Sequence, residues 1–220
     1  MLADLIVHVS TPLTLVGGAE IDNNHLNICL SVAPSVVAAD GGADHALRAN
    51  LVPLAVIGDM DSLSDTARQT FADVLHWVEE QETTDFEKAL VRIKAPLVLA
   101  IGFLGGRLDH TLSALAVLAR RRAHHVIMIS GEDICILARE GRSSLDLTPG
   151  DRLALMPLGA TRATTQGLRW NLSDSAMAPD AMVSSSNAVE TSRVTLDIAG
   201  PMLITLPMSA MAAVTAYVRA

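Results

Sequence analysis

Ile57-Gly58-Asp59-Met60-Asp61-Ser62 sets two carboxylates one residue apart, directly behind the apolar run of residues 54–57. A strand rich in Val and Ile that ends in glycine delivers the next side chains to the carboxyl end of a sheet, where open α/β folds bind ligands. Two carboxylates this close repel each other unless a cation lies between them, and Mg²⁺ favours carboxylates together with substrate phosphates. Asp-x-Asp is also common in turns, so the spacing alone leaves a metal site and a turn both open.

Polar segments of the same kind follow three further strand-like runs. They are Asp40-Gly41-Gly42-Ala43-Asp44, the acidic stretch 80–88, and Gly105-Gly106-Arg107-Leu108-Asp109-His110. A carboxylate followed by two glycines suits a ribose or metal contact, because the glycines let backbone N–H groups face a ligand. A tight turn from strand to helix explains the same residues equally well. The recurrence favours a ligand site, whereas Gly17-Gly18 is a weaker signal that fits a phosphate contact or a turn.

Residues 84–93 carry the signature of an amphipathic helix. Thr84 and Glu87 form a T-x-x-E capping box at its start. The apolar stripe, at i, i+3, i+4 and i+7, is Phe86, Ala89, Leu90 and Ile93. Asp85 and Lys88 share another face of this helix. They form either an intrahelical ion pair or a carboxylate and an ammonium presented together to a charged substrate.

The segment 105–110 offers groups suited to phosphate. Arg107 is a fork-shaped donor placed where a helix N-terminus also favours an anion. Asp109 is either the N-cap of the following helix or a member of a site. His110 stays open between a ligand, an acid and an ordinary residue of the helix start.

Bulk composition excludes several classes of protein. The chain has 220 residues, of which 50% are hydrophobic and 18% charged, so it is a folded protein with a sizeable core and not a disordered chain. Its net charge of −8 argues against non-specific nucleic-acid binding, and an acidic site for an anionic nucleotide needs a divalent metal. Cys29 and Cys135 lie in apolar runs, which indicates buried free thiols in a reducing compartment. We find neither a secretory signal nor a membrane-length apolar run, and we expect a soluble cytoplasmic protein.

The pattern of predicted secondary structure changes near the middle of the chain. Up to about residue 122 strands alternate with helices, which predicts βαβ units and a mostly parallel sheet. The expected strands include 5–9, 13–16, 35–39, 74–78 and 97–101, and the expected helices include 24–32, 64–73 and 84–93. Beyond residue 126, short β-like runs without a strong amphipathic helix suit a small antiparallel sandwich. We therefore predict an α/β domain over 1–140 and an all-β domain over 141–220, divided near Glu140-Gly141-Arg142.

Two segments stand out in the second region, Gly167-Leu168-Arg169-Trp170-Asn171-Leu172 and Ser184-Ser185-Ser186-Asn187. Trp170 is one of two tryptophans in the chain, and it is either a core residue or a platform on which a flat ring stacks.

Together these motifs resemble the thiamine pyrophosphokinase family, whose enzymes transfer a pyrophosphoryl group from ATP to thiamine. The matching segments are D-G-G-A from Asp40, G-D-M-D-S from Gly58, T-D-F-E-K-A-L from Thr84, G-G-R-L-D-H-T from Gly105, T-T-Q-G-L-R-W-N-L from Thr164 and V-S-S-S-N from Val183. The resemblance covers roughly residues 36–207 in the family's order, which is far more specific than any single motif.

The resemblance implies a Rossmann-like domain with a mostly parallel sheet, joined to a small all-β sandwich. It also implies a homodimer with thiamine bound between subunits, ATP as co-substrate, Mg²⁺ as metal, and no nucleic-acid or membrane partner. By this likeness the metal ligands are Asp40, Asp59, Asp61 and Asp85, and the catalytic residues are Asp59, Asp61, Asp85, Lys88, Arg107 and Asp109. The implied ATP contacts are Asp40, Gly41, Gly42, Thr84 and His110, and the implied thiamine contacts are Trp170, Ser186 and Asn187.

The chain departs from the family's usual pattern at two places. The usual Asp-Gln-Asp is Glu80-Gln81-Glu82 here, and a usual Asn is Asp44, which bears on metal number and geometry. Three other functions stay open: a pyrophosphokinase for another ring alcohol such as a pterin, a non-catalytic nucleotide- or thiamine-binding module, and a metal-dependent phosphatase. The density of carboxylates disfavours a mere binding module, since such a module gains little from them.

Overall fold

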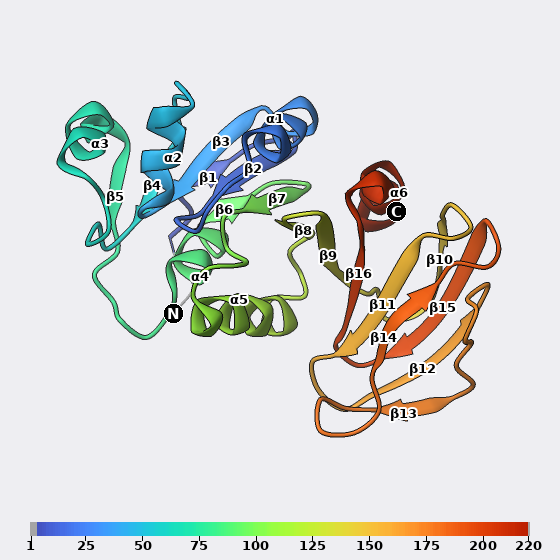
Figure 1. Cartoon of the computed structure of the whole chain (residues 1–220). Coiled ribbons are helices and arrows are strands. Elements are labelled where there is room, and N and C mark those ends of the chain that lie inside the picture. The colour runs from blue at the N-terminus through green and yellow to red at the C-terminus, as the bar shows by residue number, and fades with distance from the viewer. Residues whose placement is uncertain (1–3, 220) are drawn as a thin grey trace. The chain divides into compact units, whose positions relative to one another are not determined.

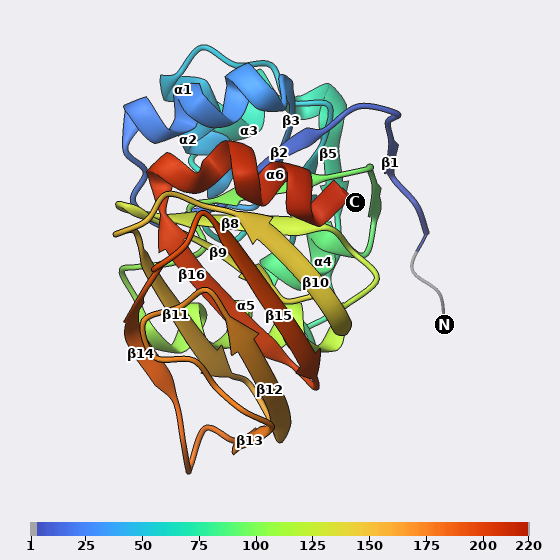
Figure 2. The same ribbon diagram turned by 90° about the vertical axis from the view of Figure 1, so that its right-hand side faces the viewer.

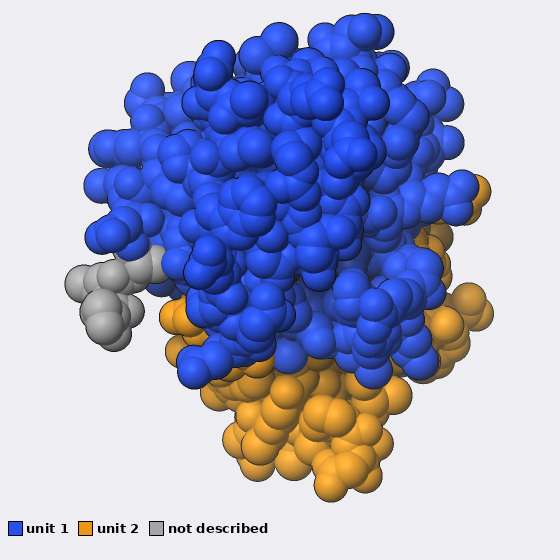
Figure 3. Space-filling model, turned by 90° about the vertical axis from the view of Figure 1, so that its left-hand side faces the viewer, with its two compact units in different colours: residues 1–117, 123–131 blue, residues 118–122, 132–220 orange. Residues whose placement is uncertain are grey.

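The computed structural model of the chain describes residues 4–219, which form two compact units (Figure 1, Figure 3). Unit 1 comprises the described residues up to Val117 together with Ala123–Gly131. Unit 2 comprises Leu118–Arg122 and the described residues from Glu132 onward. Unit 1 is a mixed α/β structure with parallel strands, whereas unit 2 is built from antiparallel strands followed by a helix.

Unit 1 is organised around parallel strands in the order β8-β7-β2-β3-β4-β5. These strands are β2 (Leu13–Val16), β3 (Ser35–Ala39), β4 (Val56–Gly58), β5 (Leu75–Trp77), β7 (Val98–Ile101) and β8 (Val126–Ser130). β2 and β7 are buried at every position, as expected of parallel strands covered on both faces. β1 (Val7–His8) and β6 (Ile93–Lys94) form a separate parallel pair.

Helices cover both faces of this sheet. α1 (Asn23–Val32), α2 (Gly42–Arg48) and α3 (Asp65–Thr70) lie over one face, and α4 (Asp85–Leu90) and α5 (Leu108–Arg120) over the other (Figure 1, Figure 2). The chain moves outward from β2 to β5 along the first face and returns along the second to β7 and β8. Right-handed crossovers require this change of face when the direction of travel reverses. The reversal puts a topological switch point at β2, where open α/β sheets bind ligands.

The predicted strands at 13–16 and 35–39 have the bounds of β2 and β3. The helix predicted over 84–93 ends early, at Leu90. The backbone N–H of Arg92 donates to the Ala89 carbonyl at 3.0 Å as the chain turns, and Ile93 then pairs with Val7 in β6. The helix predicted over 64–73 is likewise shorter, because α3 is followed by a 3-10 turn at Ala72–Val74.

Unit 2 contains two antiparallel arrangements, one in the order β10-β15-β12-β13 and the other in the order β14-β11-β16-β9. Their strands are β9 (Asp133–Leu137), β10 (Gly141–Asp146), β11 (Arg152–Pro157), β12 (Thr161–Gln166), β13 (Ser175–Met177), β14 (Ser184–Ala188), β15 (Arg193–Ala199) and β16 (Met202–Pro207). Burial alternates along β12 and β15, so each turns one face inward and one outward.

The helix α6 (Met211–Arg219) corrects the expectation that the second region has no strong amphipathic helix. It follows a 3-10 turn at Met208–Ala210. Its buried residues, Met211, Val214 and Tyr217, recur every three positions, and the Tyr217 hydroxyl accepts a hydrogen bond from the Arg139 backbone N–H at 2.9 Å. Alanines occupy positions between them, so the contrast between the buried face and the rest of the helix is small, and the amphipathic pattern is weak in the sequence.

Unit 2 begins before the predicted boundary at Glu140-Gly141-Arg142. β9 belongs to it because β9 pairs antiparallel with β16, from Leu137 opposite Leu203 to Asp133 opposite Pro207. Within residues 4–219, every helix is too short or too polar to span a lipid bilayer.

Candidate functional site

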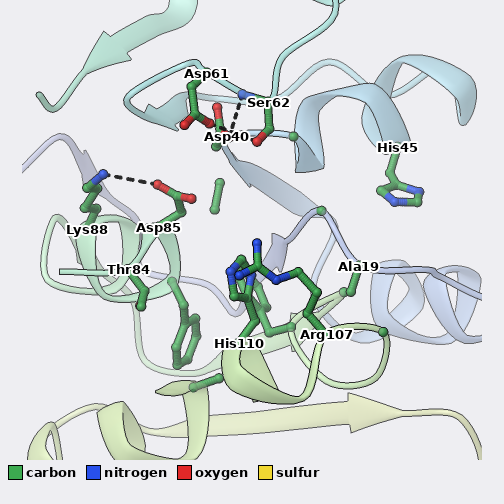
Figure 4. Close-up of a pocket in the computed structure, with 18 of the residues that line it drawn as sticks. Ala19, Asp40, His45, Asp61, Ser62, Thr84, Asp85, Lys88, Arg107 and His110 are labelled. Carbon is green, nitrogen blue, oxygen red and sulfur yellow. Dashed lines mark hydrogen bonds and ion pairs between the residues drawn. The ribbon is translucent and has the colours of Figure 1, made fainter. Parts of the chain in front are cut away.

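A cavity of about 840 Å³ lies in unit 1 at the carboxyl ends of β2, β3, β4 and β7 (Figure 4). It occupies the switch point that the strand order creates. In Figure 4 the side chains of Asp40, Asp61 and Asp85 gather toward one side, and those of Arg107 and His110 approach from the other. The cavity therefore joins an acidic group to a basic one, as a site for an anionic ligand and a cation requires.

Asp40 is the most buried of the acidic residues. It follows β3, its exposed fraction is 2%, and its φ of 41° lies in the left-handed region. Its Oδ2 accepts a hydrogen bond from the Ser62 backbone N–H at 3.2 Å, whereas its Oδ1 has no hydrogen-bond partner among the described residues. Burial, and secondarily the negative charge of Asp85, raise the pKa of Asp40. Asp40 thus lines the cavity and carries a buried oxygen without a hydrogen-bond partner among the described residues.

The predicted pair Asp59 and Asp61 follows β4 and flanks Met60. Met60 has φ 63° and is only 1% exposed, so its side chain turns into the core beneath α2 and α3. The two carboxylates consequently line the cavity. Gly58 allows the end of β4 to lie close to Asp40, because a Cβ at position 58 would lie 2.8 Å from the Asp40 Cβ. Oxygen atoms of Asp40, Asp59 and Asp61 all lie within 4.8 Å of one another.

Lys88 neutralises part of this acidic group from α4. It is 2% exposed, and its Nζ lies 2.8 Å from Asp59 Oδ2 and 3.4 Å from Asp85 Oδ1. Burial disfavours its charge, but the hydrogen bond to Asp59 and the charge of Asp85 outweigh burial and raise the pKa of Lys88. The same hydrogen bond, assisted by Gln81 Nε2 at 3.0 Å, lowers the pKa of Asp59. The structure thus shows the pair of Asp85 and Lys88 on α4, and the presentation of both groups to a charged substrate stays a prediction.

The acidic group fits a divalent cation. Three carboxylate oxygens converge, and the buried Asp40 Oδ1 lacks a partner among residues 4–219. Hard oxygen donors of this kind suit Mg²⁺, which binds one or two carboxylates and completes its shell with water and phosphate. Asp85, the fourth predicted ligand, lines the cavity but contacts Lys88, and burial raises its pKa. Its metal role stays a prediction.

The basic group contains two predicted residues and two that the sequence reasoning missed. Arg107 and His110 line the cavity, while their phosphate and ATP contacts stay predictions, and Arg107 holds Asp109 through Nη2 and Oδ2 at 2.6 Å. Asp109 itself is 64% exposed and does not line the cavity.

His45 and Arg48 of α2 are the missed members. Arg48 Nη2 lies 2.8 Å from His45 Nδ1, and since a guanidinium cannot accept, Nδ1 accepts and the ring proton lies on Nε2. Burial, reinforced by the charge of Arg48, lowers the pKa of His45. The sequence signal available for this pair was the i, i+3 spacing of His45 and Arg48, which puts them on one face of α2.

The two glycines after Asp40, Gly41 and Gly42, differ in their surroundings. Gly41 lines the cavity, as a nucleotide contact would. Gly42 does not, and a Cβ there would lie 2.1 Å from the Val16 carbonyl oxygen, so this glycine lets α2 pack on β2. The structure gives Gly42 a packing role, and its predicted ATP contact stays a prediction. Gly18 and Thr84 line the cavity, and Thr84 Oγ1 also accepts from the Glu87 N–H at 3.4 Å.

The residues that depart from the family pattern have local partners. Glu80 Oε2 accepts from the backbone N–H groups of Glu82 and Thr83 at 2.9 and 3.0 Å. Asp44 accepts from the Ser64 backbone N–H at 3.1 Å, at the start of α3. Glu80 and Asp44 thus each accept hydrogen bonds from backbone N–H groups of neighbouring loop segments.

The predicted residues of unit 2 form a separate cluster. Trp170 is 58% exposed, with the Arg169 guanidinium 5.2 Å from its ring. Asn187 is 2% exposed, and its side chain accepts from the Trp170 N–H at 3.2 Å and donates to the Trp170 carbonyl at 2.8 Å. Ser186 is exposed and has φ 59°. The structure therefore gives Asn187 a contact that holds Trp170, which the sequence reasoning missed.

Two family models match the chain, one in each region. "Thiamin pyrophosphokinase, catalytic domain" matches residues 26–129, and "Thiamin pyrophosphokinase, vitamin B1 binding domain" matches residues 142–203. Thiamine pyrophosphokinase 1 of Oryza sativa subsp. japonica is 29% identical over 197 residues, and the match covers 73% of this chain and 75% of the relative. Thiamine pyrophosphokinase 1 of Arabidopsis thaliana is 27% identical over 202 residues, and the match covers 76% of each chain.

Solved structures have the same fold. Thiamin pyrophosphokinase from Candida albicans matches with a TM-score of 0.76 at 16% identity, covering 91% of this chain and 92% of that one. The enzyme from Geobacillus thermodenitrificans matches with a TM-score of 0.75 at 22% identity, covering 90% and 97%.

Proposed function

The chain belongs to the thiamin pyrophosphokinase family, and from this premise we propose that it transfers the pyrophosphoryl group of ATP to thiamine, giving thiamine pyrophosphate and AMP. The observation that carries the proposal is the cavity of unit 1, where three convergent carboxylates and a buried lysine face an arginine and a histidine. The second family model, over residues 142–203, supports thiamine as the acceptor.

In the proposed reaction, the hydroxyl oxygen of thiamine attacks the β-phosphorus of ATP in line. A bond forms between that oxygen and the β-phosphorus, and the bond between the β-phosphorus and the oxygen bridging to the α-phosphorus breaks, so that AMP leaves with the bridging oxygen. One of the site carboxylates takes the hydroxyl proton. Catalysis by positioning and charge neutralisation is the usual pattern of phosphoryl transfer.

The chain's own residues divide this work. Asp40, Asp59 and Asp61 would hold Mg²⁺, which when bound supplies positive charge to the phosphates. Lys88 keeps its proton beside Asp59 and so contributes a fixed positive charge at the cavity wall. Arg107 lines the opposite wall and is oriented by Asp109, which supports a phosphate contact for the guanidinium.

Several finer features belong to the same proposal. We infer a Rossmann-like domain and a β-sandwich domain, supported by the strand orders of the two units. We also infer a homodimer with thiamine between subunits, which rests on the family resemblance. Cys29 and Cys135 are free and buried, and this supports a reducing, cytoplasmic location.

Product analysis tests the function. Purified protein is mixed with ATP and Mg²⁺, with and without thiamine, and the nucleotides and thiamine esters are separated by chromatography. We expect AMP and thiamine pyrophosphate in equal amounts, with thiamine and metal both required. ADP or inorganic phosphate without thiamine would identify a kinase or phosphatase, turnover with a pterin alcohol alone would change the acceptor, and binding without turnover would identify a binding module.

A further inference from the structure

The loop that carries Asp59 and Asp61 is fastened from outside the cavity by Arg68 of α3. The guanidinium Nη2 of Arg68 donates to the Met60 carbonyl oxygen at 2.6 Å. Met60 stands between the two carboxylates in the left-handed conformation, with φ 63°, which is disfavoured for residues other than glycine. A backbone in such a conformation persists only where its surroundings hold it.

Two kinds of contact hold this turn. The Met60 side chain is buried in a cluster that includes Ala67 and Phe71. The carbonyl is held by Arg68, whose half-buried guanidinium also lies 5.3 Å from the centre of the Trp77 ring. A charged donor on a carbonyl makes a stronger bond than a neutral one. Arg68 does not line the cavity, so its influence on a ligand there passes through the Met60 turn.

The two carboxylates depend on the turn to different degrees. Asp59 is held from outside the loop through its Oδ2, by Lys88 at 2.8 Å and Gln81 at 3.0 Å. Asp61 receives a hydrogen bond at 2.9 Å from the hydroxyl of Ser62, which belongs to the same loop and whose backbone N–H donates to Asp40 Oδ2 at 3.2 Å. The direction of Asp61 therefore follows the backbone at Met60.

We propose that Arg68 is a positioning residue for the cation-binding carboxylates, through its hydrogen bond to the carbonyl of the strained turn between them. This inference rests on the metal site of the proposed function. Groups that orient metal ligands from behind typically change metal affinity or activity by roughly 10- to 100-fold when removed.

The test is Mn²⁺ binding to the purified full chain without nucleotide, followed by the electron paramagnetic resonance of free Mn²⁺. Arg68→Leu removes the donor and keeps an apolar stem, Arg68→Lys keeps the charge without the fork, and Trp77→Leu is the matched control that removes the ring and keeps the donor. We expect about tenfold weaker binding for Arg68→Leu, an intermediate loss for Arg68→Lys, and a change within about twofold for Trp77→Leu.

Turnover gives a second readout that a general loss of stability would not produce. In Arg68→Leu the Mg²⁺ concentration for half-maximal rate should rise by about the same factor as the Mn²⁺ dissociation constant, while kcat at saturating Mg²⁺ returns to within about threefold of wild type. Circular dichroism in EDTA checks that each variant is folded.

The possible outcomes distinguish a failure of the Arg68 role from a failure of the proposed function. Equal Mn²⁺ affinity in folded Arg68→Leu and wild type would overturn the positioning role and leave the proposed function intact. Absence of Mn²⁺ binding in the wild type would overturn the metal site, and the positioning role with it. If Arg68→Leu does not fold, Arg68→Met decides, because it also removes the donor and keeps a longer apolar stem, and affinity equal to wild type in that variant would equally overturn the role.

Discussion

At the residue scale, Asp61 is the carboxylate that best tests the metal site. Asp61→Asn keeps the size of the side chain and a hydrogen-bond acceptor for Ser62 but removes the charge. We expect kcat/KM for thiamine pyrophosphate formation to fall by about 100-fold, because one of three convergent ligands loses its negative charge.

The measurement is the initial rate over a Mg²⁺ titration. Asp73→Asn is the matched control, since Asp73 is exposed on the 3-10 turn after α3 and does not line the cavity. Near-normal turnover of Asp61→Asn at low Mg²⁺ would show that the metal assignment is wrong.

His45 makes the stability of the protein depend on pH. Burial and the neighbouring Arg48 lower its pKa from the ordinary value of 6.5, so the unfolded chain binds the proton more readily than the folded protein. This contribution to the free energy of unfolding is complete above pH 6.5 and is lost as the pH falls through 6.5 toward the lowered pKa.

Urea unfolding at several pH values between about 5 and 8 measures the effect. The His45→Gln variant has no imidazole to titrate, so its free energy of unfolding should fall less steeply than that of wild type on acidification. An equal or steeper fall in the variant would contradict a lowered pKa for His45.

At the element scale, the packing of α2 on β2 depends on a glycine. In Gly42→Ala the new Cβ would lie 2.1 Å from the Val16 carbonyl oxygen, and backbone atoms cannot move aside cheaply. We expect a loss of about 3 kcal/mol in the free energy of unfolding, the upper end of the range for overpacking.

The neighbouring Gly41→Ala is the matched control. Gly41 has φ −53°, and its new Cβ would lie 3.4 Å from the Ser62 Cβ, so we expect a change within about 0.5 kcal/mol. Urea unfolding of both variants gives the comparison. Equal losses in the two would show that the close approach of α2 to β2 is not what requires glycine at position 42.

The elements that the sequence predicts well are those with strong local patterns. β2 and β3 are continuous apolar runs with clear ends, so their bounds follow from hydrophobicity alone. β14 reads Ser-Ser-Ser-Asn-Ala and becomes a strand through its pairing with β11, a long-range contact that leaves no local signal. α4 loses its last predicted turn because Ile93 pairs with Val7 instead. Tertiary pairing thus overrides local propensity at these places.

The candidate site divides in the same way. Its carboxylates are predictable because their type and their position after a strand both point to a ligand. His45 and Arg48 are not, since a histidine and an arginine on a helix have many unrelated uses, and only the fold turns that face of α2 toward the cavity. Asn187 shows the reverse case, since its segment was identified from the sequence while its contact with Trp170 depends on folding.

At the scale of the whole molecule, the two predicted sets of residues lie in different units. The carboxylates and Lys88 belong to unit 1, whereas Trp170, Ser186 and Asn187 belong to unit 2. One transfer reaction needs the phosphate and the acceptor hydroxyl in one place. The homodimer that we propose, with thiamine between subunits, would satisfy this need by combining unit 1 of one subunit with unit 2 of its partner.

Subunit complementation tests this arrangement. Asp61→Asn and Trp170→Ala chains carrying different affinity tags are co-expressed, and the doubly tagged species is purified. In a two-fold symmetric dimer with shared sites, one site of each mixed dimer carries both substitutions and the other carries neither, so we expect about half of the wild-type activity.

If each site were built within one subunit, both sites of the mixed dimer would carry one substitution and activity would stay at the level of the parents. If the chain were a monomer, no doubly tagged species would form. The parent proteins, assayed with thiamine below its KM, set the baseline, and activity above their mean identifies sites that two subunits build together.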